Sequence, residues 1–157
     1  MLGRVLESGI GLSELLGGLL QREKELPVSY DMMEFALQQN ENLITYRRHY
    51  RTTPQLGAVL SLMASTEMNP RSLVFYLEHA NMYLAQLPPP VQPEMLEPVK
   101  FRIRQVRSRL LLKETLDLDP LGKIGFLDEV KEVLEMLAQV VSSAYFSHTA
   151  LRAREDY

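Results

Sequence analysis

The segment from Asn69 to Leu77 holds the residues whose types and spacing are best suited to chemistry. It reads Asn-Pro-Arg-Ser-Leu-Val-Phe-Tyr-Leu. Asparagine is a frequent N-cap and proline is tolerated in the first helical turn, so the segment predicts a helix that Asn69 caps. Arg71 would lie beside the positive end of the helix dipole, where free backbone N–H groups favour a carboxylate or a phosphate. The segment therefore predicts either an ordinary helix start or an anion-binding site.

Other polar residues extend this candidate site. Arg4 and Glu7 lie one turn apart on one face of an N-terminal helix, where they form either a local ion pair or part of a polar site. Arginine binds carboxylates and phosphates through two parallel hydrogen bonds. We therefore expect a patch that binds a peptide carboxylate or another anion. Its candidate residues are Arg4, Glu7, Tyr46, Arg47, Asn69 and Arg71.

Two other hypotheses are open. In a catalytic domain, Glu7 or Glu41 would be a general base and the arginines would stabilise an anionic intermediate, so these side chains would converge in a pocket. In a structural scaffold, the polar residues would be helix caps and ion pairs, and nearby carbonyls or carboxylates would satisfy Arg47 and Arg71. The positions of these side chains in the folded chain distinguish the hypotheses.

Several common catalytic and cofactor-binding motifs are absent from the sequence. There is no P-loop, dinucleotide fingerprint or nucleophile elbow. The lack of cysteine excludes disulfides and thiolate zinc sites. The histidines His49, His79 and His148 fall on three different predicted helices, and neither a His-Glu-x-x-His nor a Glu-x-x-His pair occurs. We therefore expect no metal and no cofactor.

A group of cations lies on the fifth predicted helix, on both sides of an apolar stripe. Long aliphatic stems can cover the edges of a buried stripe while the charged ends pair with carboxylates of the sixth helix. The alternative is a surface for an anionic partner or a membrane surface. The group consists of Lys100, Arg102, Arg104, Arg107, Arg109 and Lys113.

The spacing of apolar residues predicts helices throughout the chain. The expected helices cover residues 2–23, 30–51, 53–64, 70–87, 93–112 and 126–154. Glycines in the first helix predict the close approach of a neighbouring helix or a break near Gly17 and Gly18. No stretch shows the alternation typical of a strand. The sequence therefore predicts an all-α single domain over residues 1–157, built as an antiparallel bundle of five to six helices.

The composition excludes some classes of partner. The formal net charge of -3 argues against nucleic-acid binding, which relies on a basic surface. No apolar run is long enough to span a membrane, and charged residues interrupt the N-terminal apolar segment, unlike the core of a signal peptide. Together with the lack of cysteine, these features predict a cytoplasmic protein.

Four segments resemble the alpha-E domain, a bacterial helical domain, in their order and spacing. They are Gly3-Arg4-Val5-Leu6-Glu7, Ile44-Thr45-Tyr46-Arg47, Asn69-Pro70-Arg71-Ser72 and Tyr145-Phe146-Ser147-His148. The chain looks like the C-terminal part of such a domain, because it lacks counterparts of the family's N-terminal helices. We therefore expect a truncated domain or a piece of a longer chain. Missing helices would expose apolar surface that could drive homodimerisation.

The resemblance also implies an all-helical fold and a functional context. Alpha-E domains are fused to, or encoded beside, circularly permuted ATP-grasp proteins and transglutaminase-like peptidases. ATP-grasp enzymes join a carboxylate to an amine through an acyl-phosphate. By this association, we expect a noncatalytic accessory domain of an amide-ligase system for peptide synthesis or tagging, with the ATP-grasp protein as its partner.

Overall fold

The computed structural model describes residues 1–90 and 92–146, and every regular element in these residues is helical. The all-α class predicted from the sequence is therefore confirmed. The α-helices are α1 (Leu2–Glu25), α2 (Tyr30–Gln39), α3 (Leu43–Tyr50), α4 (Leu56–Leu60), α5 (Leu73–Gln86), α6 (Glu97–Leu111) and α7 (Pro120–Tyr145). Three short elements complete the described chain: the π-helical turn η1 (Ser61–Ser65) and the 3-10 turns η2 (Pro93–Met95) and η3 (Glu114–Asp117).

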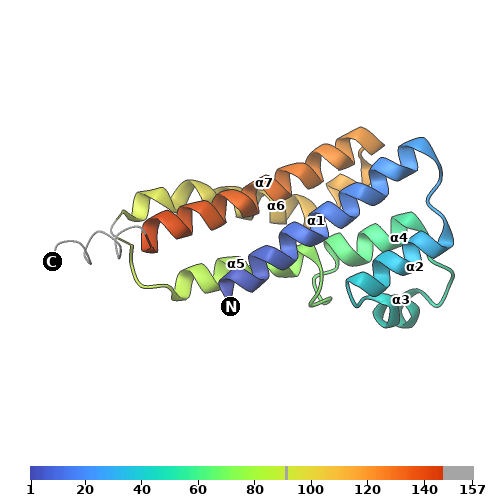
Figure 1. Cartoon of the computed structure of the whole chain (residues 1–157), viewed down its shortest axis with the longest axis horizontal. Helices are drawn as coiled ribbons and strands as arrows, with labels where there is room; N and C mark the ends of the chain where they lie inside the picture. The colour runs from blue at the N-terminus through green and yellow to red at the C-terminus, as the bar shows by residue number, and fades with distance from the viewer. Residues whose placement is uncertain (91, 147–157) are drawn as a thin grey trace.

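The long helices α1, α5, α6 and α7 form a bundle in which each helix contacts two neighbours. Helix α1 packs against α7 and α5, and α6 packs against the same two helices from the other side. Neighbouring helices of this group run in opposite directions (Figure 1). The three shorter helices α2, α3 and α4 follow α1 and lie together at one end of the bundle (Figure 1). The structure is thus an antiparallel four-helix bundle with a three-helix extension.

The core of the bundle contains the apolar stripes that the sequence pattern predicts. On α6 the residues Val99, Ile103, Val106 and Leu110 are all buried. They face fully buried residues of the neighbouring helices, which include Leu16, Leu73, Leu77, Leu134 and Leu137. Helical spacing places such residues on one face, and burial of that face is the main source of stability for a helix in water.

The prediction of one helix over residues 30–51 is wrong. Helix α2 ends at Gln39 and α3 begins at Leu43, and Glu41 between them has a φ of 52°, in the left-handed region. The side chain of Asn40 donates a hydrogen bond of 3.0 Å to the carbonyl oxygen of Arg71, far along the chain. This long-range contact competes with continuation of the helix. The division of this one helix into α2 and α3 raises the number of α-helices in the described chain from the expected six to seven.

Two other predicted boundaries move. Helix α7 begins at Pro120 and not near residue 126, because the Asp119 side chain caps it by accepting a hydrogen bond of 2.8 Å from the Gly122 N–H. The predicted helix over residues 53–64 consists of the short α4 followed by the π-helical turn η1. The expected end of the last helix at Arg154, and His148 of the aromatic motif, lie outside the described residues.

The glycines of α1 do not break the helix, which continues through Gly17 and Gly18. Only Gly9 provides a close approach inside the chain, since a Cβ atom at this position would lie 2.8 Å from Cδ1 of Leu134 on α7. A Cβ atom at Gly17 would meet nothing within 4 Å. Two glycines of one helix therefore have different roles in packing.

Substitution of these two glycines by alanine is expected to change stability in opposite directions. Gly17→Ala should raise the free energy of unfolding by about 0.5–1 kcal/mol, because alanine favours the helix and meets no neighbour. Gly9→Ala should lower it by up to about 2 kcal/mol, because crowding of the fully buried Leu134 outweighs the gain in helix propensity. Urea denaturation of both variants measures the two changes, and a shift in the same direction would contradict this account of α1.

Candidate functional site

Of the six candidate residues, Arg71 lies on a groove between α1, α2 and the beginning of α5. The groove has a volume of about 470 Å³. Its wall is partly apolar and partly polar, which is typical of a binding site that fixes the orientation of its ligand with a few polar groups. The lining residues are Ser8, Gly11, Leu12, Leu15, Phe35, Gln39, Asn40, Arg71 and Tyr76.

The polar end of the groove joins residues from three parts of the chain. The Arg71 guanidinium forms an ion pair with Glu41, and both side chains are largely exposed. The Tyr76 hydroxyl faces the side chain of Ser8 on α1. Burial raises the pKa of Tyr76, although the charge of Arg71 and the contact with Ser8 partly offset this effect. Tyr76 therefore remains a neutral hydroxyl beside a cation, a combination suited to a carboxylate ligand.

Arg4 and Glu7 lie on exposed positions of α1, and neither lines the groove. No ion pair or hydrogen bond joins either side chain to another group in residues 1–90 and 92–146. The local ion pair considered for these residues is therefore not formed. The polar residue that α1 contributes to the groove is the neighbouring Ser8.

Tyr46 is a buried structural residue, with none of its surface exposed. Its hydroxyl accepts a hydrogen bond of 3.1 Å from the Gln55 N–H and donates one of 3.4 Å to the Thr53 carbonyl. Its ring packs against Tyr50 at a centroid distance of 4.7 Å. These contacts fix the link between α3 and α4, and they leave no surface of Tyr46 for a ligand.

Arg47 forms an exposed ion pair with Glu34 of α2, with the nitrogen and oxygen 3.3 Å apart. A hydrogen bond with the same glutamate raises the pKa of Tyr30. Neither Arg47 nor Glu34 lines the groove at Arg71. Arg47 therefore belongs to a separate surface cluster between α2 and α3.

Asn69 does not cap α5, so that prediction is wrong. The cap is Ser72, whose hydroxyl accepts a hydrogen bond of 3.2 Å from the Phe75 N–H and donates one of 2.8 Å to the Thr66 carbonyl. Asn69 is buried in the preceding turn. Its side chain donates to the Leu62 carbonyl at 3.0 Å and accepts from the Arg71 N–H at 3.1 Å. Asn69 therefore fixes the backbone that carries Arg71 and does not itself face a ligand.

The groove continues along α1 beyond Leu15 and Phe35, which line both halves. The second half has a volume of about 480 Å³ and is lined by Glu14, Leu15, Gly18, Leu19, Asp31, Met32, Phe35 and Ala36. Phe35 is 59% exposed, which is high for a large apolar side chain. We call the two halves together the α1–α2 groove. It has a polar end at Arg71, and its second half carries the carboxylates Glu14 and Asp31.

Sequence reasoning identified Arg71 but missed Ser8, Tyr76 and Phe35. Ser8, Gly11, Leu15 and Gly18 share one face of α1, with the spacing of three and four residues that a helix face requires. That face combines small, apolar and polar residues, and this signal was visible in the sequence. The pairing of Ser8 with Tyr76 had no local signal, because it joins α1 to α5.

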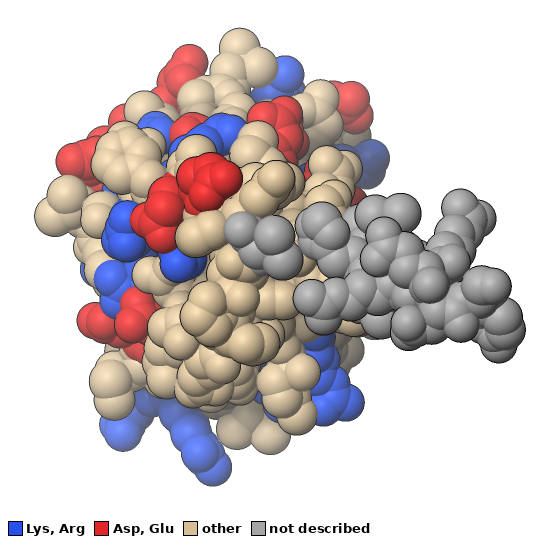
Figure 2. Space-filling model, turned by 90° about the vertical axis from the view of Figure 1, so that its left-hand side faces the viewer, with Lys and Arg blue, Asp and Glu red and all other residues tan. Residues whose placement is uncertain are grey.

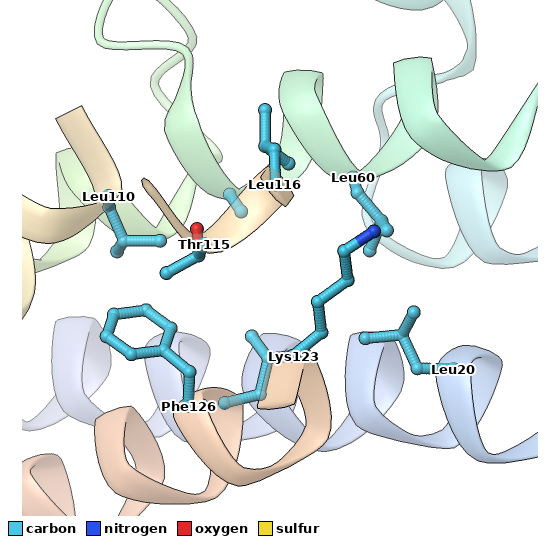
Figure 3. A pocket seen from close by; sticks show the side chains of 9 residues that line it. Leu20, Leu60, Leu110, Thr115, Leu116, Lys123 and Phe126 are labelled. Carbon is cyan, nitrogen blue, oxygen red and sulfur yellow. The ribbon is translucent and has the colours of Figure 1, made fainter. Parts of the chain in front are cut away.

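A smaller cavity lies between the helices α1, α6 and α7 and the short elements α4, η1 and η3 (Figure 3). It measures about 20 Å³, and its walls include Leu60, Thr115, Lys123 and Phe126. A cavity of this size has room for about one water molecule. It is therefore too small to hold a substrate or a cofactor.

The described residues contain no cluster of histidine, aspartate and glutamate side chains that could hold a metal ion. Glu7 and Glu41 do not converge with arginines inside a pocket, as a catalytic base would require. Glu41 is exposed and paired with Arg71, and Glu7 is exposed on α1 outside the groove. The geometry of residues 1–90 and 92–146 thus gives the catalytic hypothesis no support.

Several cations of α6 form ion pairs, but only partly as expected. Arg109 pairs with Glu129 of α7 at 2.9 Å and lies 4.3 Å above the ring of Phe126. Arg107 pairs with Glu78 of α5 at 2.7 Å and with Glu67 at 3.3 Å, and therefore not with the last helix.

Charges of both signs also alternate around an uncharged centre at one end of the bundle (Figure 2). That end of the molecule is not a uniformly basic surface.

None of the described helices combines the length and the apolar character that crossing a membrane requires.

The chain is similar to long proteins of mycobacteria. It is 27% identical over 136 residues to the uncharacterized protein Rv2567 of Mycobacterium tuberculosis and, to the same extent, to the uncharacterized protein Mb2597 of Mycobacterium bovis. Each match covers 85% of this chain and 15% of the relative, so the chain spans a small part of these proteins. No solved structure matches the chain significantly.

A family model matches residues 1–146 of the chain. The family is Alpha-E, described as a predicted alpha-helical domain with a conserved ER motif. In this sequence no glutamate is directly followed by arginine, and Glu7 is followed by Ser8. The match nevertheless covers all the helices described above. The chain therefore belongs to the Alpha-E family.

Proposed function

We propose that the chain is a noncatalytic recognition domain that binds a carboxylate-bearing segment of a partner in the α1–α2 groove. The observation that carries this proposal is the position of Arg71 at the polar end of that groove, beside the neutral hydroxyl of Tyr76. Arginine can bind a carboxylate through two hydrogen bonds, and a nearby hydroxyl can donate a third. Apolar walls at Leu15 and Phe35 would hold the adjoining part of the ligand.

The ion pair between Arg71 and Glu41 does not prevent this role. The side chain of Arg71 is 45% exposed and that of Glu41 is 67% exposed. An exposed ion pair contributes little to stability, about 0–1 kcal/mol, because water screens the charges. A ligand carboxylate can therefore replace Glu41 at low cost, whereas Glu41 keeps Arg71 in place when the groove is free.

The partner that we propose is a circularly permuted ATP-grasp protein of an amide-ligase system. Its support is the family context implied by the sequence resemblance, together with a groove suited to a carboxylate. ATP-grasp enzymes activate a carboxylate, so a separate domain that positions a peptide carboxylate or docks the ligase fits that chemistry. The long relatives are compatible with a role inside a larger assembly, since the matched segment is a small part of them.

The structural scaffold is the second candidate, and one observation favours it. Both Arg47 and Arg71 are paired with carboxylates of the chain, as a scaffold without a ligand site predicts. The two hypotheses differ in what Arg71 does when a partner is present. They can therefore be separated by comparing two arginine variants that break similar ion pairs.

Arg71→Ala is expected to reduce capture of the proposed partner, a circularly permuted ATP-grasp protein, at least tenfold, with ATP present. Arg47→Ala is the matched control, because it removes another exposed arginine paired with one glutamate. Both variants should melt within a few degrees of the parent chain, since each loses only an exposed ion pair. The measurement is a pull-down with purified proteins, with and without ATP, after circular dichroism has shown that each chain is folded.

Either of two results would reject the proposal in favour of the scaffold. The first is equal capture by the Arg71→Ala and Arg47→Ala chains. The second is no capture by the folded parent chain at all. If Arg71→Ala lowers capture only in proportion to a fall in its melting temperature, that result would also count against a binding role of Arg71.

A further inference from the structure

We infer that the occupant of the α1–α2 groove is an amphipathic α-helix of a partner protein, about three turns long, that lies antiparallel to α1 with its C-terminal end at Arg71. This inference rests on the proposed function, because it names the kind of partner that the same groove receives. It follows from four properties of the groove: its floor, its walls, its length and the charges at its two ends.

The floor of the groove contains two glycines of α1 that no contact inside the chain explains. Gly11 and Gly18 lie two turns apart, and a Cβ atom at either position would meet nothing within 4 Å. Glycine weakens the interior of a helix relative to alanine, so its presence has a cost. A residue without a side chain lets another backbone approach closely. Gly9, by contrast, is needed for the internal packing of α1 against α7.

The walls of the groove favour a helical occupant over an extended peptide. Leu15, Met32 and Phe35 present apolar side chains, and the backbone groups of α1 and α2 are used inside these helices. An extended peptide on such a surface would bury N–H and C=O groups without partners, which is costly. A helix satisfies its own backbone groups and needs to offer only an apolar face.

The length of the groove sets the length of the occupant. Its lining residues on α1 extend from Ser8 at the polar end to Gly18 and Leu19 in the second half. The axial distance from Ser8 to Gly18 is about 15 Å, at a rise of 1.5 Å per residue. This distance equals about three turns of a partner helix.

The charges at the two ends set the direction of that helix. In the second half of the groove, Asp31 at the start of α2 and Glu14 near the middle of the groove line its wall. Lys131 pairs with Glu14 at 2.9 Å but also lies 3.9 Å from Glu135, so carboxylates outnumber the cation there. Arg71 lies at the opposite end, where its exposed partner Glu41 balances its charge until a ligand carboxylate replaces that glutamate. A helix dipole is positive at its N-terminus and negative at its C-terminus, so the favoured orientation places the C-terminus at Arg71.

The test is a selection from a library of helix-stapled peptides, displayed on phage, with the full chain as the target. We expect enriched peptides to carry Lys or Arg in their first turn, Asp or Glu in their last turn, and an apolar face with small residues. A peptide from this set with its terminal charges exchanged should bind at least tenfold more weakly, as measured by fluorescence anisotropy.

Two alanine variants of neighbouring glycines provide the matched control. Gly18→Ala places a methyl group on the floor of the groove and should weaken binding of the enriched peptides at least fivefold. Gly17→Ala adds the same group to the same helix at a position that does not line the groove, and it should leave binding unchanged. Both variants should melt at or above the temperature of the parent chain, which excludes unfolding as the cause.

Four results would overturn the helix inference: no enrichment, selection of proline-containing extended sequences, equal binding after charge exchange, or equal binding by the Gly17→Ala and Gly18→Ala chains. The failure of the proposed function has a different signature. If Gly18→Ala weakens binding but Arg71→Ala does not, helix docking is supported and carboxylate recognition by Arg71 is rejected. If only Arg71→Ala weakens binding, carboxylate recognition is supported and helix docking is rejected.

Discussion

Replacement of Tyr46 by alanine is expected to lower the free energy of unfolding by about 3–5 kcal/mol, the range for removing a large buried aromatic side chain. Tyr46 is fully buried, and its ring packs against Tyr50. Its hydroxyl also connects two backbone groups of the link between α3 and α4. The substitution removes both kinds of contact. Urea denaturation followed by circular dichroism measures the loss.

Two phenylalanine variants separate the ring from the hydroxyl. Tyr46→Phe keeps the ring but leaves the Gln55 N–H and the Thr53 carbonyl without this partner, and it should cost about 1–3 kcal/mol. Tyr50→Phe is the control, because the Tyr50 hydroxyl has no hydrogen-bond partner in the described part of the chain. It should change stability by less than about 0.5 kcal/mol. An unchanged stability of Tyr46→Phe, combined with lost partner capture, would instead make Tyr46 a ligand-binding residue.

Asn69→Ala is expected to have the second largest effect, a loss of about 2–4 kcal/mol. The Asn69 side chain is 3% exposed and makes one hydrogen bond to the Leu62 carbonyl and one to the Arg71 N–H. Each backbone group that is left buried without a partner costs about 1–3 kcal/mol. The variant should also weaken partner binding, since it loosens the turn that carries Arg71. Thermal and urea unfolding give the first effect, and the pull-down gives the second.

Asn81→Ala is the control for this prediction. Asn81 lies half-buried in the interior of α5, and its side chain has no hydrogen-bond partner within residues 1–90 and 92–146. Alanine is the better helix former, so this variant should be neutral or slightly stabilising. Equal stability of the Asn69→Ala and Asn81→Ala chains would show that the Asn69 contacts do not hold the turn before α5.

The two structural residues clarify how the proposed site is built. Asn69 was a candidate for contact with a ligand, but its contribution is to hold the backbone from which Arg71 reaches the groove. Asn40 adds a second constraint by donating to the Arg71 carbonyl from the end of α2. The turn that carries Arg71 is therefore fixed from both sides before any partner arrives. A backbone that is already fixed loses less conformational freedom on binding than a mobile one.

The sequence by itself determined the helical class and much of the core. The spacing of Val99, Ile103 and Val106 predicted the buried face of α6, because helical periodicity is a local property that each segment carries. The start and approximate end of α1 could be predicted for the same reason. The sequence also pointed to Arg71, since an arginine near a helix start is visible in a short segment.

The tertiary structure alone decided where helices stop and which polar residues meet. Both Asn69 and Ser72 are residue types that commonly cap helices. Ser72 is the cap because the Asn69 side chain is instead hydrogen-bonded to the carbonyl oxygen of Leu62, seven residues earlier in the sequence. The break after Gln39 likewise depends on a contact with the distant Arg71 carbonyl. The groove needs Ser8, Phe35 and Tyr76 from three helices. Such contacts depend on how the chain folds back on itself, so they cannot be predicted from the helix propensity or the apolar periodicity of a single segment.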